Sequence, residues 1–483
     1  MRRELVVWTV ALLAAVSSAA PQPTNINETK AIPKGSVVIS VDPSVEIGPI
    51  KPMNAVNNGP QPSRGDQKRS CWREFCALKV PYARSHDAAL HSGYGGQHMG
   101  DITAIFPNFD ADENDPASYD FTLTDKYVKD LASAGTKTFF RLGQSIEHWI
   151  KKYGVLPPKD NAKWARVCEH VIAHYTEGWA DGFDAGIVYW EIWNEPDLDA
   201  RNENWKKNPR TWGGSPEDFF AFYETAAKHL KARFPQLKIG GPAIAGGTGD
   251  KGWGEKFLAY MERHRVPIDF LSWHGYMTTP VAAVDRAKEW RRRLDAHGYT
   301  KAESIYNEWN YVEGWSDEYP RSVDRIRGLK GAVFTASVMA ACQDAPVDML
   351  MYYDLRPNTI FNGVFDFNSM NPLPGYWAFY AWRRLADAGT QVEAKLAGDT
   401  SGVRAIAARG KDGRARLLVA NYTFDENFHA SKTVAVAFPR PFVDGRVHLV
   451  DSRFTYAETE FPVRDGRLVL TLEPLSFAVV ELP

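Results

Sequence analysis

Residues 189–197 are YWEIWNEPD, a short run of strand-forming residues that ends at a proline. Alternation along the run puts the side chains of Trp190, Ile192 and Asn194 on one face, so Glu195 is expected at the rim, where the strand becomes a loop. The proline that follows has no backbone N–H to donate, so the strand ladder stops there. The stretch therefore predicts a strand that ends in polar residues.

The same pattern recurs on both sides of this stretch. From about residue 50, short apolar runs alternate with segments of helical periodicity, which indicates repeated βαβ units. Strands are expected at 50–57, 80–86, 137–142, 185–193, 237–241, 268–274, 304–309 and 347–354. Helices are expected at 123–134, 162–178, 216–234, 253–264, 281–297, 323–341 and 374–388. Eight strands alternating with helices favour an α/β fold, a (β/α)8 TIM barrel over residues 50–389, with a doubly wound open sheet as the alternative.

The chain on either side of this repeat has a different pattern. Residues 390–483 hold short strands separated by Gly and Asp turns, which is typical of a β-sandwich. Within the N-terminal segment 21–49, residues 36–41 form one isolated strand pattern. A lone strand leaves its edges unpaired, so this strand is expected to join the C-terminal sandwich.

Residues 1–20 resemble an export signal. They carry two arginines, a short apolar run and a cluster of small residues, and the run is shorter than the ~20 residues that span a bilayer. We therefore expect a cleaved signal peptide, a secreted or periplasmic protein, and no membrane attachment after cleavage.

Composition excludes several classes of protein. Apolar residues make up 44% and charged residues 24% of the 483 residues, which is ordinary for a globular protein. The formal net charge is −2, so no overall basic field is present to bind nucleic acid. Four cysteines are too few for a disulfide scaffold, although Cys71 and Cys76 are close enough in sequence to pair in an oxidising compartment. The sequence leaves that pairing open and predicts no oligomeric state.

A second carboxylate occupies an equivalent position on another strand. The strand at 304–309 ends in YNEWN, with Glu308 at its rim. In a (β/α)8 barrel the catalytic groups sit at the C-terminal ends of the strands, so Glu195 and Glu308 are expected to face one another across the barrel mouth. Glycoside hydrolysis needs such a pair, one carboxyl protonated as the acid and one ionised as nucleophile or base. The alternative for either residue alone is a solvated surface carboxylate.

The motif WNEP, residues 193–196, resembles the signature of the clan of retaining glycosidases with (β/α)8 barrels. More closely, the chain is similar to glycoside hydrolase family 39, which includes β-xylosidases and α-L-iduronidases, from about residue 50 to the end. The resemblance implies a double-displacement mechanism with Glu195 as the acid/base and Glu308 as the nucleophile. It also implies that Asn194 hydrogen-bonds the sugar 2-hydroxyl.

The resemblance implies further residues in the same pocket. His274 and Tyr276 follow the sixth strand in SWHGY, and a tyrosine there would donate to the nucleophile. The second strand ends with Arg84 and His86, which would point into the barrel mouth. A cation near Glu308 would lower the pKa of that carboxyl, whereas burial would raise the pKa of the acid/base.

Other residues have two open interpretations. Trp309 is a candidate platform for stacking on a sugar, as are Trp149 and Trp315, although aromatic residues that only pack loops are commoner. Asp354 ends the eighth strand beside Arg356 and would bind a sugar hydroxyl or form a structural ion pair. Arg141 and Gln144, at the end of the third strand, would contact sugar or pair within the barrel.

The predicted substrate is an oligo- or polysaccharide. The resemblance suggests exo action on a pentose, 6-deoxyhexose or uronic acid, and we favour pentosides of plant or microbial heteroglycans. A uronate would require a cation such as Arg84, Arg141 or Arg356 aimed at its carboxylate. Segments 92–100 and 199–214 are where we expect specificity to be determined.

No metal or organic cofactor is predicted, because carboxylate chemistry of this kind requires none. Iduronidase-like or arabinosidase-like specificity on the same site is one alternative. A catalytically silent carbohydrate-binding barrel is another, and the C-terminal domain is either a packing accessory or a carbohydrate-binding module.

Overall fold

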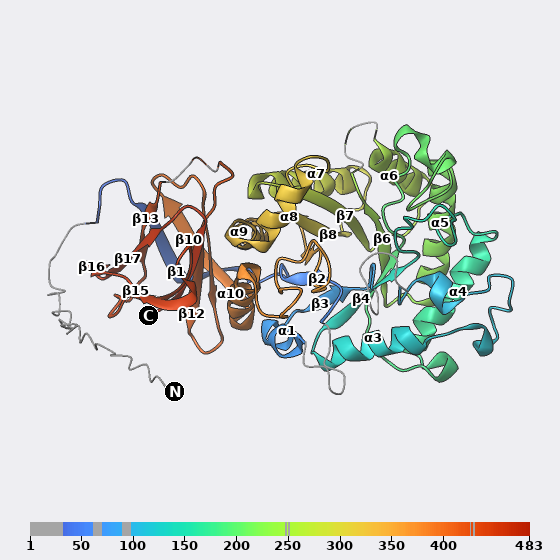
Figure 1. Ribbon diagram of the computed structural model, residues 1–483, viewed down its shortest axis with the longest axis horizontal. Coiled ribbons are helices and arrows are strands. Elements are labelled where there is room, and N and C mark those ends of the chain that lie inside the picture. Colours follow the sequence, from blue (N-terminus) through green and yellow to red (C-terminus); the bar gives the residue numbers. More distant parts are fainter. Residues whose placement is uncertain are drawn as a thin grey trace, which may run out of the picture.

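The computed structural model describes residues 32–60, 70–88, 98–246, 249, 252–425, 427 and 430–483. It has two parts side by side, a barrel surrounded by helices and a separate β domain (Figure 1). The predicted signal peptide at residues 1–20 and most of the 92–100 segment lie outside the described residues. Among those that are described, no helix is long and apolar enough to cross a membrane.

Eight parallel strands close into a barrel, which confirms the predicted fold class. The barrel strands are β2 (Ala55–Asn57), β3 (Tyr82–Arg84), β4 (Lys137–Leu142), β5 (Tyr189–Ile192), β6 (Lys238–Ile244), β7 (Phe270–Met277), β8 (Glu303–Tyr311) and β9 (Met349–Tyr352). Each strand pairs with its neighbours in chain order, and β9 pairs with β2 to close the ring. That closure excludes the doubly wound open sheet.

Helices surround the barrel in Figure 1. They are α1 (Trp72–Leu78), α2 (Ile102–Ile105), α3 (Thr122–Ser133), α4 (Asn161–Thr176), α5 (Pro216–Arg233), α6 (Trp253–Arg263), α7 (Pro280–Ala296), α8 (Tyr319–Arg327), α9 (Leu329–Gln343) and α10 (Pro374–Ala388), with 3₁₀ turns η1 (Pro116–Ser118), η2 (Trp179–Asp181) and η3 (Arg201–Lys206). The single helix predicted at 323–341 is wrong, because the chain becomes extended at Gly328 and divides that segment into α8 and α9. The short helices α1 and α2 were not predicted.

Local sequence signals set the helix boundaries. The hydroxyl of Ser215 accepts the backbone N–H of Asp218 at 3.1 Å, and the Asp218 carboxylate accepts the backbone N–H of Ser215 at 2.9 Å. This capping box, followed by Pro216 at the first helical position, fixes the start of α5. At the start of α7 the Thr279 hydroxyl accepts the backbone N–H of Ala282, and Pro280 is the first helical residue.

The barrel interior is apolar at its base and polar above. Side chains from six strands fill the base, namely Ala55, Phe139, Tyr189, Phe270, Ile305, Met349 and Met351. The outward side chains of the same strands pack against the helices in a much larger core. The barrel is thus a packed scaffold that holds its polar residues at one end.

The predicted C-terminal β domain is a ten-stranded mixed sheet. Its strands are β1 (Val37–Pro49), β10 (Thr390–Ala397), β11 (Val403–Arg409), β12 (Ala415–Asn421), β13 (Lys432–Ala437), β14 (Arg446–Val450), β15 (Thr455–Glu460), β16 (Val463–Arg464), β17 (Arg467–Leu472) and β18 (Ser476–Leu482). The N-terminal strand β1 lies between β10, to which it is antiparallel, and β13, to which it is parallel. Alternate residues from strands far apart in the sheet order meet in one core, so the sheet is folded over on itself.

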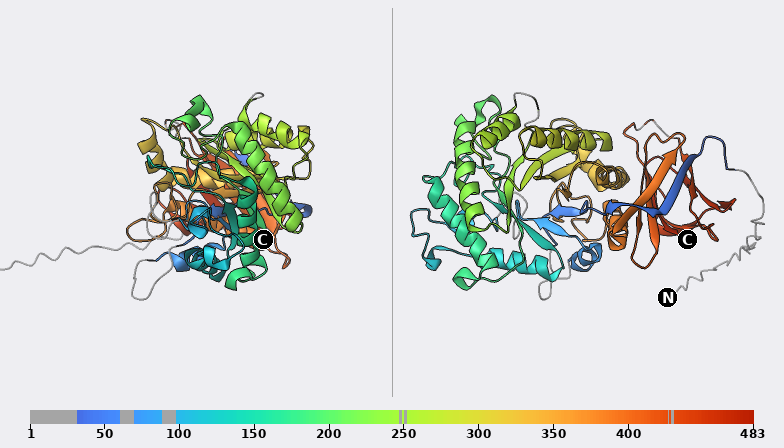
Figure 2. Two further views of the ribbon diagram at one scale, coloured as in Figure 1. Left: turned by 90° about the vertical axis from the view of Figure 1, so that its right-hand side faces the viewer. Right: turned by 180° about the vertical axis from the view of Figure 1, so that it is seen from behind.

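The β domain is packed tightly on the barrel. The opposite face of β12 and β18, with Leu418, Ala420 and Val479, joins the core formed by the barrel helices. Figure 2 shows α9 and α10 at this junction. In the same part of the barrel, no disulfide joins Cys71 to Cys76, so the pairing that the sequence left open is not formed in this structure.

Candidate active site

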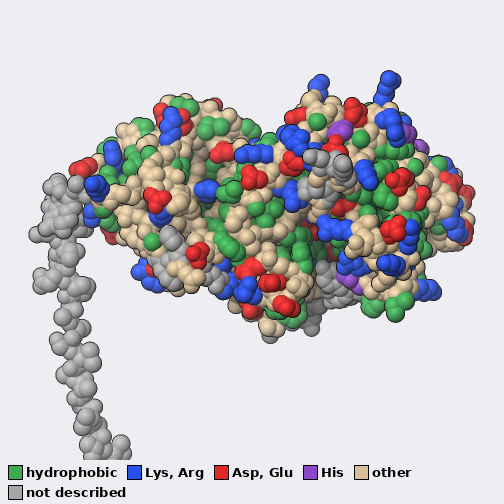
Figure 3. Space-filling view, turned by 90° about the horizontal axis from the view of Figure 1, so that it is seen from above, with side chains coloured by type: hydrophobic (Ala, Val, Ile, Leu, Met, Phe, Trp, Pro, Cys, Tyr) green, Lys and Arg blue, Asp and Glu red, His purple; other side chains and the backbone are tan. Residues whose placement is uncertain are grey.

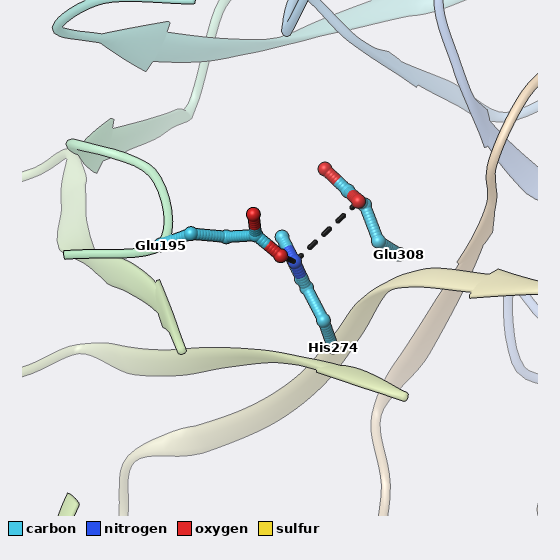
Figure 4. Close-up of side chains that lie close together, drawn as sticks. All are labelled: Glu195, His274 and Glu308. Atoms are coloured by element: carbon cyan, nitrogen blue, oxygen red, sulfur yellow. Dashed lines mark hydrogen bonds and ion pairs between the residues drawn. The ribbon is translucent and has the colours of Figure 1, made fainter. Parts of the chain in front are cut away.

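Glu195 and Glu308 meet at the C-terminal end of the barrel. Glu195 follows β5, and Glu308 lies within β8. Both are buried, with exposed fractions of 8% and 5%. Their carboxyl groups face one another with the ring of His274 between them (Figure 4). The structure therefore brings the two predicted catalytic carboxylates into one site.

A sharp turn at the end of β5 directs Glu195 into this site. Trp193 has a φ of 78° and Glu195 a φ of 50°, both in the left-handed region. The predicted alternation, which put Asn194 on the same face as Trp190 and Ile192, is therefore wrong. The two apolar side chains pack in the core outside the barrel, whereas Asn194 turns inward.

A β-bulge directs Glu308 inward. Trp273 pairs with Tyr306 and His274 pairs with Glu308, so Asn307 is an extra residue in β8. Bulges re-aim side chains and are frequent beside active sites. Because of this bulge, the consecutive side chains of Asn307 and Glu308 both face the barrel interior.

Glu308 is surrounded by hydrogen-bond donors. Arg84 Nη1 donates to its Oε1 at 2.9 Å, and the Tyr276 hydroxyl donates to its Oε2 at 2.8 Å. Burial and the neighbouring Glu195 raise the pKa of Glu308, whereas His274, Arg84 and Tyr276 lower it, and the outcome is a pKa of about 7. The contacts that favour the charged form make Glu308 the carboxyl better suited to carry negative charge.

Glu195 has a different environment. Its Oε1 lies 2.7 Å from His274 Nδ1, and no guanidinium contacts it within the described part of the chain. Burial and the negative charge of Asp197 raise the pKa of Glu195, and despite the opposing charges of Arg84 and Arg210 it reaches about 8. Burial also lowers the pKa of His274 to about 4, so that ring is neutral near pH 7. Glu195 is the carboxyl that keeps its proton to the higher pH.

The two carboxyl groups are close to one another. A carboxylate oxygen of Glu195, one of Glu308 and a ring nitrogen of His274 all lie within 4.8 Å of one another. The same three atoms have a spacing that suits a metal ion. The His274 Nδ1 atom lies 2.7 Å from Glu195 Oε1 and 3.4 Å from Glu308 Oε2, so these groups can also hold a proton without a metal.

A polar layer beneath the carboxylates fixes Arg84. Its guanidinium donates to Glu191 Oε2 at 2.6 Å, to Asn194 Oδ1 at 2.6 Å and to Asn57 Oδ1 at 3.1 Å, in addition to Glu308. Glu191 in turn accepts hydrogen bonds from the Ser272 hydroxyl and from the side-chain amide of Asn307. Sequence reasoning missed Glu191, although its place two residues after Tyr189 in a buried strand was a usable signal.

A cavity of about 1180 Å³ opens above the two carboxylates, and both line it. One part of its wall is aromatic and is formed by Tyr276, Trp315, Tyr319, Tyr353 and Phe361. Another part is basic and is formed by Arg201, Arg210, Lys256 and Arg286. Two of these cations come from the predicted specificity segment 199–214.

Comparison with known proteins identifies the family. The sequence profile described as glycosyl hydrolases family 39 matches residues 72–357, which is more than half of the chain. The chain belongs to glycosyl hydrolase family 39. A curated β-xylosidase from Geobacillus stearothermophilus is 24% identical over 378 residues, covering 71% of this chain and 70% of the relative. This family 39 chain is therefore a glycosidase.

Solved structures support the fold of this family 39 glycosidase. A glucosidase from Croceicoccus marinus has a TM-score of 0.71 at 22% identity, covering 92% of this chain and 98% of its own. A monomeric β-xylosidase from Caulobacter crescentus has a TM-score of 0.62 at 17% identity, covering 92% of this chain and 99% of its own. An α-L-arabinofuranosidase from Thermotoga petrophila has a TM-score of 0.65 at 14% identity, covering 93% of this chain and 100% of its own.

Several predicted substrate-binding residues of the family 39 chain lie at the site. Tyr276 and His274 contact the carboxylates directly, and His86 Nε2 lies 3.7 Å from Glu308 Oε1. Neither ring nitrogen of His86 nor the side-chain nitrogen of Asn194 has a hydrogen-bond partner among the described residues, and all three are buried. Arg84 is fully buried beneath the carboxylates, so it positions Glu308 rather than reaching the cavity.

Two predicted substrate contacts do not fit the structure. Trp309 is 1% exposed and its ring packs against Phe334 and Tyr352, because the bulge that turns Glu308 inward turns the next residue outward. Asp354 is fully buried and forms an ion pair with Arg356 at 2.6 Å, so the structural interpretation holds for this carboxylate.

The arginines proposed for a uronate are also engaged elsewhere. Arg141 forms a buried ion pair with Asp101, and Gln144 donates to the same carboxylate at 3.0 Å. Arg356 pairs with Asp354, and Arg84 with Glu191 and Glu308. Of the exposed aromatic candidates, Trp315 lines the cavity, whereas Trp149 lies on an exposed segment beside it.

Proposed function

We propose that the chain is an exo-acting, retaining glycosidase that hydrolyses β-xylosides or closely related pentosides by double displacement. The observation that carries this proposal is the pair of buried carboxyl groups with opposite environments. Their short separation supports retention, because retaining enzymes hold these groups ~5–5.5 Å apart and inverting enzymes ~6.5–9.5 Å apart. The named relatives support the choice of sugar.

In the first step Glu308 attacks the anomeric carbon while Glu195 gives its proton to the glycosidic oxygen. The sugar is then bonded to Glu308, and the leaving group departs as an alcohol. Arg84 and Tyr276 hold Glu308 ionised and correctly oriented for the attack. His274 lies between the two carboxyl groups and fixes their relative positions as a neutral ring.

In the second step Glu195, now ionised, takes a proton from water. The resulting hydroxide attacks the anomeric carbon from the side that the leaving group vacated, and the bond to Glu308 breaks. Two inversions at the same carbon leave its configuration unchanged, and Glu195 is protonated again.

A panel of aryl glycosides tests this proposal. We expect the wild type to release chromophore from an aryl β-xyloside and less or none from aryl arabinosides, glucuronides, galactosides and iduronides. Glu308→Gln should lower kcat/KM by on the order of 10⁴-fold or more, because the nucleophile is lost. Proton NMR of the first product formed should show the β-anomer.

Each other outcome has a defined meaning. Initial release of the α-anomer would disprove retention. Equal sugar binding by wild type and Glu308→Gln with no turnover by either would favour the carbohydrate-binding alternative. Activity on a different panel member, lost in the same variant, would keep the mechanism and change the sugar.

We also propose that the protein is exported, on the basis of residues 1–20 alone. Determination of the N-terminal sequence of the protein recovered from the periplasm or the medium tests this. A mature chain that begins near residue 21 is expected, and retention of the full N-terminus inside the cell would contradict it.

A further inference from the structure

The cavity has two chemically different walls on either side of the catalytic pair. The aromatic wall is formed by Tyr276 of β7 and by residues that follow β8 and β9, with Trp315 and Tyr319 after the strand that carries Glu308. The basic wall follows β5 and β6, with Arg201 and Arg210 in the segment after β5 that also holds Glu195. Lys256 of α6 and Arg286 of α7 complete it.

The basic wall is concentrated around the loop after β6. Arg286 Nη1 donates to the carbonyl of Gly246 at 3.3 Å, and a side chain added at Gly246 would collide with Arg201 Nη2. Two guanidinium groups from different elements therefore flank one glycine. The acidic residue here, Asp197, accepts the backbone N–H groups of Ala245 and Gly246 at 2.7 and 2.9 Å.

These cations are not used to hold the fold together by ion pairs. Among the described residues, no salt bridge involves Arg201, Arg210, Lys256 or Arg286. Buried arginines of the barrel behave differently, since Arg84 and Arg141 both pair with carboxylates. Four cations line a cavity with three carboxylates in a chain whose net charge is −2. Lys and Arg side chains are frequent on the barrel half in the view of Figure 3.

The mechanism decides which part of a substrate meets this wall. Glu308 attacks the anomeric carbon from one side, so the leaving group departs on the other. Glu195 must reach the oxygen that joins the two sugars, which places the leaving sugar beside Glu195. The leaving sugar therefore lies next to the loops after β5 and β6, where the basic wall is.

We propose that the leaving-group side of the cavity recognises an anionic sugar, either a uronate or a sulfate ester. Arg201 and Arg286 are the main contacts, because both converge on Gly246, and guanidinium groups bind carboxylate and sulfate oxygens through paired donors. This inference rests on the proposed function, because that function orients the substrate.

The test compares three substrates with the same xylose at the non-reducing end. The xylose is linked to glucose, to glucuronic acid or to 6-sulfated glucose. We expect kcat/KM to be roughly 10-fold higher for the anionic leaving groups, and the preference to shrink as ionic strength rises from about 0.05 to 0.5 M. Comparison of the uronate with the sulfate identifies which anion the wall fits.

Variants locate the effect. Arg201→Gln and Arg286→Gln should each reduce the ratio of anionic to neutral kcat/KM by roughly 3-fold, and the double variant should abolish the preference. Lys288→Gln is the matched control, because Lys288 lies two residues along α7 from Arg286, is exposed and does not line the cavity. That variant should keep the wild-type ratio.

Failure of this inference is distinguishable from failure of the proposed function. Hydrolysis with equal rates for all three leaving groups, unchanged in the arginine variants, would disprove the anion site and leave the glycosidase intact. If no substrate is hydrolysed, calorimetry with the same three sugars decides. Binding of the anionic sugars that is tighter than that of the neutral one, and lost in the double variant, would support the wall, and equal binding would disprove it.

Discussion

Glu195 and Glu308 are two buried glutamates of one cavity, but their neighbours differ. Glu308 receives a guanidinium and a phenol hydroxyl at 2.9 and 2.8 Å, whereas Glu195 receives a histidine that is neutral near pH 7 and lies near the negative Asp197. Burial is the largest cause that raises the pKa of both carboxyl groups. What separates their roles is therefore the set of contacts made by the layer beneath, and each prediction below perturbs one side of that difference.

The largest expected effect is a loss of activity that depends on the leaving group when the acid is replaced, but not when the nucleophile is replaced. Glu195→Gln should lower kcat/KM for xylobiose by about 10²–10⁴-fold, because a sugar alcohol must be protonated as it leaves. For an aryl xyloside with an acidic phenol the loss should be much smaller. Steady-state kinetics on both substrates checks this, with Glu308→Gln as the control that loses both activities alike. Equal losses in Glu195→Gln would contradict the acid/base assignment.

Removal of Arg84 should act mainly on Glu308. Arg84→Met should lower kcat/KM by about 10²-fold and move the acid limb of its pH profile upward, because loss of a cation makes Glu308 harder to ionise. In the wild type the profile should be a bell with its maximum between about 7 and 8, where Glu308 is ionised and Glu195 still protonated.

Two matched variants sharpen the Arg84 prediction. Arg84→Lys keeps the charge but cannot reach four side chains at once, so activity should fall while the acid limb moves less. Arg141→Met removes another buried barrel arginine, whose partner is Asp101, and should cost stability without moving the limb. A limb that shifts equally in Arg84→Met and Arg141→Met would show that general loosening of the barrel, and not the contact to Glu308, is responsible.

Loss of one hydrogen bond to the nucleophile should have a smaller effect. Tyr276→Phe should lower kcat/KM roughly 10- to 100-fold and raise the acid limb slightly, because the hydroxyl stabilises ionised Glu308. Tyr299→Phe is the control, since its hydroxyl donates to the Val266 carbonyl at 3.0 Å away from the site. An unchanged rate in Tyr276→Phe would exclude the contact from catalysis.

The smallest expected effect concerns stability. The pKa of Glu195 is about 8 when folded, above its ordinary value of 4.5, so its ionisation destabilises the folded chain as pH rises through that range. At pH 9 the Tm of Glu195→Gln should therefore exceed that of the wild type by roughly a few degrees, and at pH 4 the two Tm values should be similar. Calorimetry at the two pH values checks this, and a Tm difference that does not depend on pH would contradict it.

The sequence predicted the main carboxylates because a strand end and a proline are local signals. It could not predict that β8 contains an extra residue at Asn307, since a bulge depends on pairing with β7. The error over Trp309 follows directly from that. The direction of Asn194 was mispredicted for a similar reason. The positive φ of Trp193 turns the backbone and interrupts the strand alternation, which the residue types alone do not reveal.

The polar layer illustrates the same limit. Glu191 and Arg84 are far apart in sequence, and only barrel closure shows that one accepts from the other. Asp354 and Arg356 were close enough in sequence for an ion pair to be considered, and that pairing is present. The barrel itself was predictable because eight strands and the helices between them repeat one pattern, whereas the division at Gly328 depends on a single residue.

The position of β1 has a consequence for how the chain is made. This strand leaves the ribosome before the barrel, yet both of its partners, β10 and β13, are encoded after it. Its two edges stay unpaired while the entire barrel is synthesised, so the β domain cannot close until translation is nearly complete. A nascent chain that stalls within the barrel therefore exposes β1 as an unpaired strand, and chaperones can bind that strand.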